Sequence, residues 1–113
     1  MAGPGNGYID IFNFDGDLLL RFASQGVLNS PWGLTIYGKH LLVGNFGDGR
    51  VNAFSLKSRE FKGSLQKQVP GGKIPVVIDG LWSILNVECT LFFAAGLDAE
   101  NHGLFGKLVS LDK

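Results

Sequence analysis

The sequence predicts an all-β fold in which a four-stranded antiparallel sheet is repeated along the chain. The pair of phrases PWGLTI and HLLVGN within residues 31–45 recurs as GLWSIL and TLFFAA within residues 80–95. Trp32 and Trp82 thus hold matching places 50 residues apart, and a fixed period of this size is typical of repeat architectures. Glycine supplies 17 of the 113 residues, which suits many tight turns between short strands.

Period-two alternation predicts the first strands. Residues 8–12 (YIDIF) alternate, and the turn pair at residues 15–16 (DG) leads into a return strand at residues 18–22. A polar loop follows at residues 24–30. Further strands are then predicted, in chain order, at residues 32–36, 41–45, 50–54 and 61–65.

The second half of the chain repeats the first after an interruption. Residues 66–73 contain VPGG and predict a loop. Beyond this loop, strands are predicted at residues 81–85, 91–95 and 104–109, and they repeat the first three strands of the unit. The single domain, residues 1–113, is therefore expected to hold the last two strands of one unit at 8–22, a complete unit at 32–65, and three strands of the next at 81–109.

Two predicted strands are apolar on both faces. Residues 41–43 (LLV) and 91–93 (LFF) do not alternate, so each strand must be covered on both sides. Stacked four-stranded sheets, as in the blades of a β-propeller, meet this requirement, whereas a two-sheet sandwich leaves one face of each sheet wet. The pattern favours about two and a quarter propeller blades, which is an incomplete ring. We expect the matching Trp32 and Trp82 to pack between blades.

Several phrases carry a resemblance to a known family. Residues 31–36 together with 41–54 (LLVGNFGDGRVNAF) resemble the NHL repeat of β-propellers. More closely, the chain from residue 3 to about 110 is similar to the C-terminal part of a family of uncharacterised, often exported propeller proteins that are much longer than this chain. The likeness is carried by residues 5–12 (GNGYIDIF), 45–50 (NFGDGR), 78–82 (IDGLW) and 102–106 (HGLFG). The resemblance implies a six-bladed fold and no established activity.

The leading functional interpretation is a non-enzymatic scaffold or binding module for a protein or small-molecule ligand at the loop face of the assembled ring. One alternative is a piece of a metal-dependent propeller enzyme of the lactonase or lyase type, and another is a truncated product with no independent function. Three copies could also complete a six-bladed ring, with residues 8–22 finishing the blade begun by residues 81–95 of a neighbour. Residues 104–109 of the neighbour would compete with residues 8–22 for the position beside residues 91–95.

Asn45 and Asp48 are candidate ligand-binding residues in the glycine-rich hairpin at residues 44–49 (GNFGDG). They could lie at the mouth of a propeller channel, where loops commonly bind ligands. Asn, Asp and Gly in such a hairpin are also ordinary turn formers, and this structural interpretation is favoured. Asp79, before the predicted strand at residues 81–85, is the third candidate, and the enzyme alternative would place it at the channel.

Asp98, Glu100 and His102 form the densest group of metal-ligand side chains in the sequence. Carboxylates and imidazole suit a divalent cation, the one cofactor considered, but their spacing matches no calcium loop. A solvated loop is therefore favoured, and no cofactor is expected. No catalytic residues are predicted, and Cys89 has no recognisable base partner.

Charge and composition exclude several classes of partner. Ten basic and ten acidic side chains cancel, so neither nucleic acid nor a membrane surface is an expected partner. The single cysteine excludes an internal disulfide and a multi-cysteine metal site. No apolar run is long enough for a signal peptide or a transmembrane helix, which leaves the compartment open.

Overall fold

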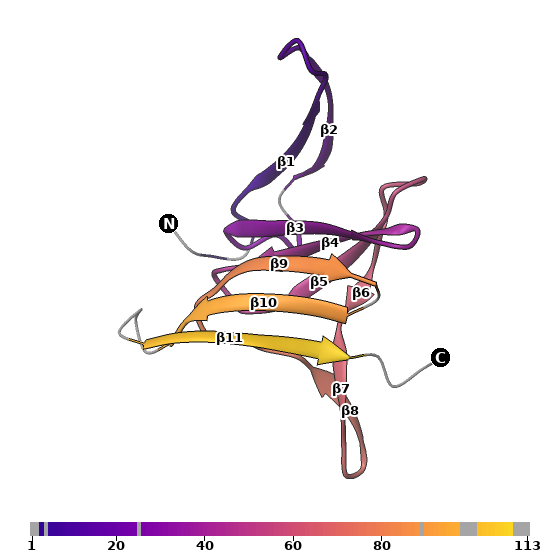
Figure 1. Ribbon diagram of the computed structural model, residues 1–113. Helices are drawn as coiled ribbons and strands as arrows, with labels where there is room; N and C mark the ends of the chain where they lie inside the picture. The colour runs from indigo at the N-terminus through magenta and orange to yellow at the C-terminus, as the bar shows by residue number, and fades with distance from the viewer. Residues whose placement is uncertain (1–2, 4, 25, 89, 98–101, 110–113) are drawn as a thin grey trace.

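The computed structural model describes residues 3, 5–24, 26–88, 90–97 and 102–109. In this part of the chain the all-β prediction is confirmed, because every element with defined bounds is a strand and all strand pairs are antiparallel (Figure 1). No helix among the described residues is long and apolar enough to cross a membrane. The strands are β1 (Tyr8–Phe12), β2 (Leu18–Ser24), β3 (Pro31–Tyr37), β4 (His40–Asn45), β5 (Val51–Ser55), β6 (Phe61–Ser64), β7 (Gln66–Val69), β8 (Gly72–Pro75), β9 (Leu81–Val87), β10 (Thr90–Gly96) and β11 (His102–Val109).

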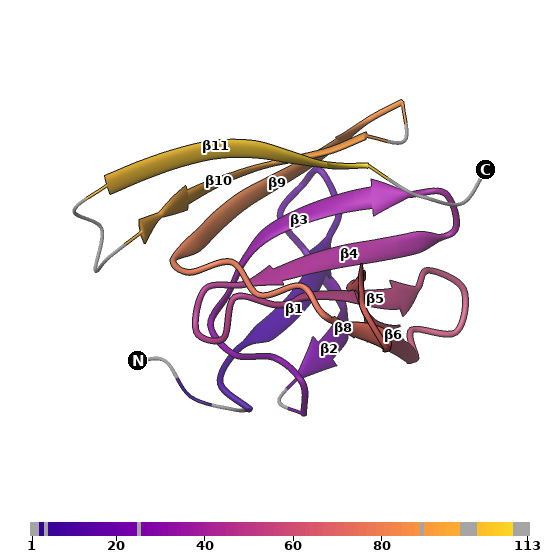
Figure 2. The ribbon, with the colours of Figure 1, turned by 90° about the horizontal axis from the view of Figure 1, so that it is seen from below.

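These strands form three stacked layers and one projecting hairpin. We call β1–β2 the N-terminal hairpin, β3–β4–β5–β6 the middle sheet and β9–β10–β11 the C-terminal sheet. Figures 1 and 2 show the middle sheet between the other two layers, with β7–β8 projecting from the stack. Strands therefore lie where the sequence pattern predicted them, apart from β7 and β8.

The loop predicted at residues 66–73 is wrong. Its residues pair as β7 and β8, from Gln66 opposite Pro75 to Val69 opposite Gly72. Pro70 and Gly71 make the turn, and Gly71 has a φ of 90° that suits glycine. The strand residues QKQV and GKIP are largely polar and exposed, so they lack the apolar alternation on which the prediction depended.

The middle sheet is covered on both faces, as the apolar run at residues 41–43 predicted. On one face, Val43 packs in a cluster with residues of the N-terminal hairpin and the loop after it. On the other face, its neighbour Leu42 packs in a second cluster with residues of the C-terminal sheet. The first cluster contains Ile9, Phe22, Leu28, Val43 and Phe54, and the second contains Leu42, Val51, Ile78, Leu81, Ile84, Leu91, Phe93 and Ala95.

The corresponding prediction for residues 91–93 is wrong within the described structure. Leu91 and Phe93 are buried against the middle sheet, but Phe92 points the other way. Its ring stacks on Phe105, with ring centroids 5.8 Å apart and planes at 13°. Phe105 is 73% exposed, because no described element covers that side of the C-terminal sheet. Within the described residues, this apolar strand therefore has one covered face and one open face.

The 50-residue period is visible in the backbone. Phe46 N donates to Ser30 O at 2.9 Å, and the matching Gly96 N donates to Gly80 O at 2.9 Å. Ser30 and Gly80 also share a left-handed backbone, with φ values of 53° and 65°. The two sequence phrases therefore adopt the same local geometry at the start of β3 and of β9.

The first strands of the two larger sheets lie against each other. A Cβ on Gly33 of β3 would lie 2.8 Å from both Trp82 O and Ile84 N of β9, so glycine permits this close approach. Further along the same strands, Asn86 N donates to Thr35 Oγ1 and Asn86 Nδ2 to Ile36 O, each at 2.9 Å. These contacts fix the middle sheet relative to the C-terminal sheet.

Candidate functional site

Asn45 is a fully buried residue at the end of β4, and its hydrogen bonds connect segments of the protein's own backbone. Its Nδ2 donates to Val27 O at 2.9 Å, which ties β4 to the loop after the N-terminal hairpin. Its main chain closes the hairpin turn, since Asn45 N donates to Arg50 O and Gly49 N donates to Asn45 O. Oδ1 of Asn45 is buried and has no partner among the described residues. The side chain of Asn45 thus joins two segments that are distant in the sequence, rather than bonding to its own turn as the sequence favoured. Ligand binding by Asn45 stays a prediction.

Asp48 lies in the turn between β4 and β5. Its Oδ1 accepts a hydrogen bond from Arg50 N at 3.0 Å, as an aspartate in a turn commonly does. The turn is held from both sides, because Gly47 N donates to Asn29 O and Ile78 N donates to Gly49 O. Asn45 and Asp48 therefore help to build a junction where three segments of the chain meet.

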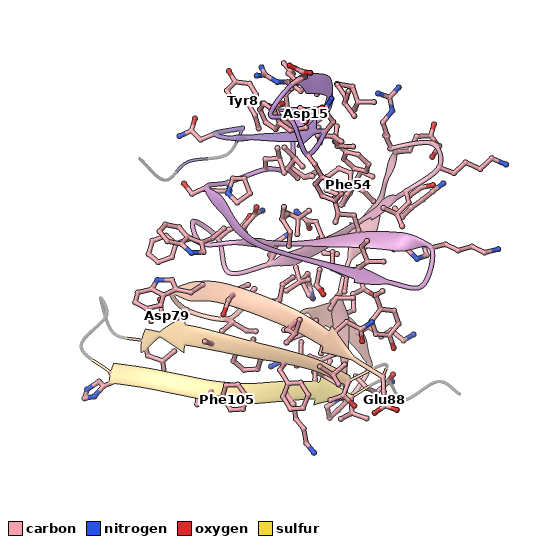
Figure 3. The ribbon with its side chains drawn as sticks, turned by 45° about the horizontal axis from the view of Figure 1, so that its top comes forward. Tyr8, Asp15, Phe54, Asp79, Glu88 and Phe105 are labelled. Carbon is pink, nitrogen blue, oxygen red and sulfur yellow. The ribbon has the colours of Figure 1, made fainter. Side chains whose placement is uncertain are left out.

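Asp79 and His102 lie at the same end of the C-terminal sheet. Asp79 is exposed in the turn before β9, where Figure 3 labels it, and His102 begins β11. The neighbouring backbone is connected through the Gly96–Gly80 hydrogen bond and a bridge between Leu97 and His102. The other two predicted metal ligands, Asp98 and Glu100, lie outside the described residues, as does Cys89. The residues that are described contain no group of three metal-ligand side chains, so the cation site stays a prediction.

The prediction that the two tryptophans pack between the sheets is wrong. Trp32 is 68% exposed and Trp82 is 40% exposed. Each is the extra residue of a β-bulge, because the strand pairing skips from Pro31 to Gly33 and from Leu81 to Ser83. A bulge redirects the side chain it carries, which explains why matching positions in the repeat both present their indole rings to solvent.

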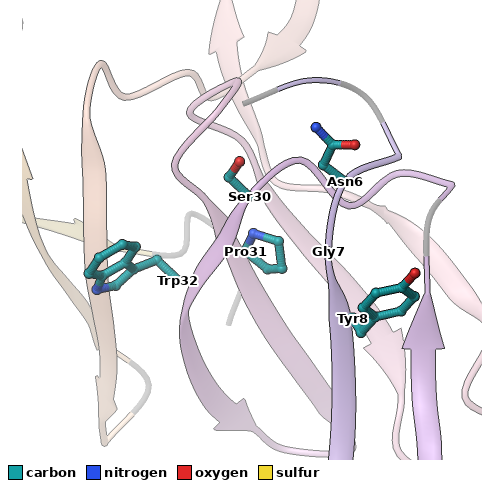
Figure 4. Close-up of a pocket in the computed structure, with 6 residues that line it drawn as sticks. All are labelled: Asn6, Gly7, Tyr8, Ser30, Pro31 and Trp32. Carbon is teal, nitrogen blue, oxygen red and sulfur yellow. The ribbon is translucent and has the colours of Figure 1, made fainter. Parts of the chain in front are cut away.

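A first hollow, of about 540 Å³, lies at the junction of the N-terminal hairpin and the middle sheet (Figure 4). Trp32 and Tyr8 line it, with Asn6, Gly7, Ser30 and Pro31 between them. Arg21 covers the ring of Tyr8 with its guanidinium carbon 4.0 Å from the ring centroid. Arg21 Nε also donates to Asp10 Oδ1 at 2.8 Å, and this hydrogen bond raises the pKa of Arg21 above its ordinary value.

A second hollow, of about 400 Å³, lies between the loop after β2, the strands β5 and β6, and the base of the β7–β8 hairpin. We call it the Arg50 hollow. Among its lining residues, only Asp48 was a candidate from the sequence, because the fold brings the walls together from separate segments of the chain. Its polar lining residues are Asn29, Asp48, Arg50, Asn52, Ser64 and Gln66, and Phe61 and Pro75 are among its apolar ones.

Comparison with known proteins gives relatives in one virus. The chain is 38% identical to "Uncharacterized protein L690" of Acanthamoeba polyphaga mimivirus over 94% of its own length and 30% of that protein. It is 39% identical to "Uncharacterized protein R648" of the same virus over 96% of its own length and 28% of that protein. The chain thus spans less than a third of these curated relatives. No protein-family model matches the sequence, and no solved structure matches it.

Proposed function

We propose that this chain is a segment of an NHL-like, six-bladed β-propeller that serves as a non-enzymatic scaffold and binding module. The observation that supports the proposal is the two-sided cover of the middle sheet, in which Leu42 and Val43 pack against different neighbouring sheets. Consecutive antiparallel sheets packed face to face are the arrangement of propeller blades. The resemblance to NHL repeats and the 50-residue period agree with it.

The open side of the C-terminal sheet supports the existence of a further blade. Phe92 and Phe105 hold the places in the repeat that Leu42 and Val51 hold in the middle sheet. Leu42 and Val51 are 4% and 0% exposed under the C-terminal sheet, whereas the matching aromatic rings have no described cover. A large exposed apolar face of this kind commonly marks an interaction surface. We call the face bearing Leu85, Phe92 and Phe105 the C-terminal open face.

The N-terminal hairpin has an open side of its own. Phe12 occupies the same position in its repeat as Phe54 does in the next one. Phe54 is 5% exposed, whereas Phe12 is 55% exposed. Figure 3 shows Phe54 between the N-terminal hairpin and the middle sheet, and Phe105 on the C-terminal sheet at the other end of the stack. Two different open faces at the two ends of a stack allow head-to-tail packing, which closes into a ring when the rotation between copies permits.

The proposed partner is therefore either the next blade of a longer protein or a second copy of this chain. In the three-copy ring, the hairpin of one copy would pair with β10 of its neighbour. In the structure, however, β11 already pairs with β10 from Thr90 opposite Val109 to Gly96 opposite Gly103. A composite blade of that kind requires β11 to leave, whereas face-to-face packing does not.

Light scattering on the chain tests the open faces. We expect a weight-average mass that exceeds 12.2 kDa and rises with protein concentration, with three times 12.2 kDa as the value for a three-copy ring. Phe105→Ser should lower the association, because it removes an aromatic side chain from the C-terminal open face. Phe14→Ser is the matched control, since Phe14 is fully exposed in the β1–β2 turn and away from that face. A mass of 12.2 kDa at every concentration would contradict the proposal, as would equal association of the two variants.

A further inference from the structure

We propose that the Arg50 hollow binds a small organic carboxylate, with the guanidinium of Arg50 as its main partner. The inference belongs to the proposed binding role of the scaffold, but it does not depend on how a ring is completed. All the walls of the hollow come from residues 26–75, which lie within this chain. The middle sheet, which supplies much of the lining, has both of its neighbouring layers in place.

Arg50 is a charged residue without a structural partner. It lines the hollow, and its guanidinium forms no ion pair or hydrogen bond within the described part of the chain. The Asp48 oxygen nearest in sequence accepts from the backbone N of Arg50. The other two copies of the repeat carry Tyr8 and Leu104 at this place, so blade packing does not require an arginine here.

Asn29 is a second polar residue that lines the same hollow. The residue is only 7% exposed, and its Oδ1 accepts a hydrogen bond from Gly3 N at 2.8 Å. Its Nδ2 then has no acceptor among the described residues, although it belongs to a lining residue. An amide donor of this kind can donate a hydrogen bond to an oxygen atom of a bound ligand.

The neighbouring wall is rigid. Asn52 is 2% exposed, its Nδ2 donates to Val27 O at 3.2 Å, and its Oδ1 accepts from Ser64 Oγ. On the other side of Asn29, a Cβ on Gly47 would overlap the Asn29 side chain, so that glycine makes room for it. Polar groups held in this way need little reordering when a ligand binds.

The charges in the hollow favour a carboxylate over a phosphate ester. Arg50 is the one cation among the described residues that line the hollow, and the guanidinium fork fits both oxygens of a carboxylate. Asp48 lies in the same lining and would repel a second negative charge. Phe61 and Pro75 supply apolar contact for the body of the ligand. A volume of about 400 Å³ lies within the usual range for small-molecule sites.

Benzoate is a suitable probe. Benzamide is its neutral isostere, and phenyl phosphate tests whether a dianion binds better. In 1H–15N NMR titrations of the full chain, we expect benzoate to shift the side-chain amide signals of Asn29 and Gln66 saturably. Benzamide should not shift them, and phenyl phosphate should bind more weakly than benzoate. Arg50→Gln should weaken benzoate binding by about tenfold or more. Arg59→Gln changes an arginine that does not line the hollow, so it should leave the affinity for benzoate unchanged.

Three results would overturn the inference: no saturable shift at these amides up to about 10 mM benzoate, equal shifts with benzamide, or equal binding by the two arginine variants. Tighter binding of phenyl phosphate would overturn the assignment to a carboxylate. Because Arg50 is exposed, an unchanged backbone spectrum is expected for Arg50→Gln. The mass measurement above tests the open faces, so failure there is distinguishable from failure here.

Discussion

Phe54→Ala is expected to lower the free energy of unfolding by about 3–5 kcal/mol. Phe54 is 5% exposed between the middle sheet and the N-terminal hairpin. Its ring contacts Phe22 edge to face at 6.1 Å between centroids and Phe61 at 5.8 Å. Removing it leaves a cavity at the centre of that interface. Urea unfolding followed by circular dichroism measures the change.

The repeat supplies a matched control for this prediction. Phe12 holds the same place in its unit but is 55% exposed, so Phe12→Ala should cost less than about 1 kcal/mol. Both variants should be compared at the lowest practical concentration, where the open faces are not occupied by other copies. Equal losses at the two positions would show that the N-terminal hairpin is not the uncovered end of the stack.

Leu81→Ala is expected to lower the free energy of unfolding by about 2–5 kcal/mol. Leu81 is fully buried at the start of β9, in the cluster that joins the middle sheet to the C-terminal sheet. Its side chain also contacts the backbone at Gly44, where an added Cβ would lie 3.0 Å from Leu81 Cδ2. Leu85→Ala on the same strand is the control, because Leu85 is 58% exposed on the C-terminal open face. This substitution should lower the free energy of unfolding by no more than about 0.5 kcal/mol. A loss at Leu81 as small as that at Leu85 would mean that the two sheets are not packed together.

Sequence reasoning located the three layers of the stack because their strands have apolar residues in recognisable patterns. Residues 41–43 predicted cover on both faces, and the opposite burial of Leu42 and Val43 agrees. The β7–β8 hairpin was missed because its pairing depends on backbone hydrogen bonds between polar, exposed residues. Its sequence contains a turn signal but no apolar alternation.

The orientation of single side chains was harder to predict than the strands. Trp32 and Trp82 point to solvent because each lies in a β-bulge, and no residue type in the two phrases identifies a bulge. The Arg50 hollow was missed for another reason: its walls are brought together by the fold from four segments of the chain. One signal was present, since Arg50 departs from its counterparts Tyr8 and Leu104 in the repeat.

The most direct test of the stacked arrangement is a set of nuclear Overhauser contacts from the methyl groups of Leu42 and Val43 in one NMR sample. We predict that Val43 contacts Ile9 and Phe22, while Leu42 contacts Leu81 and Leu91. Two adjacent residues of one strand would then report two different covering sheets. Contacts to a covering sheet from only one of these residues would contradict the stack, because a two-sheet sandwich leaves the other face of the strand in water.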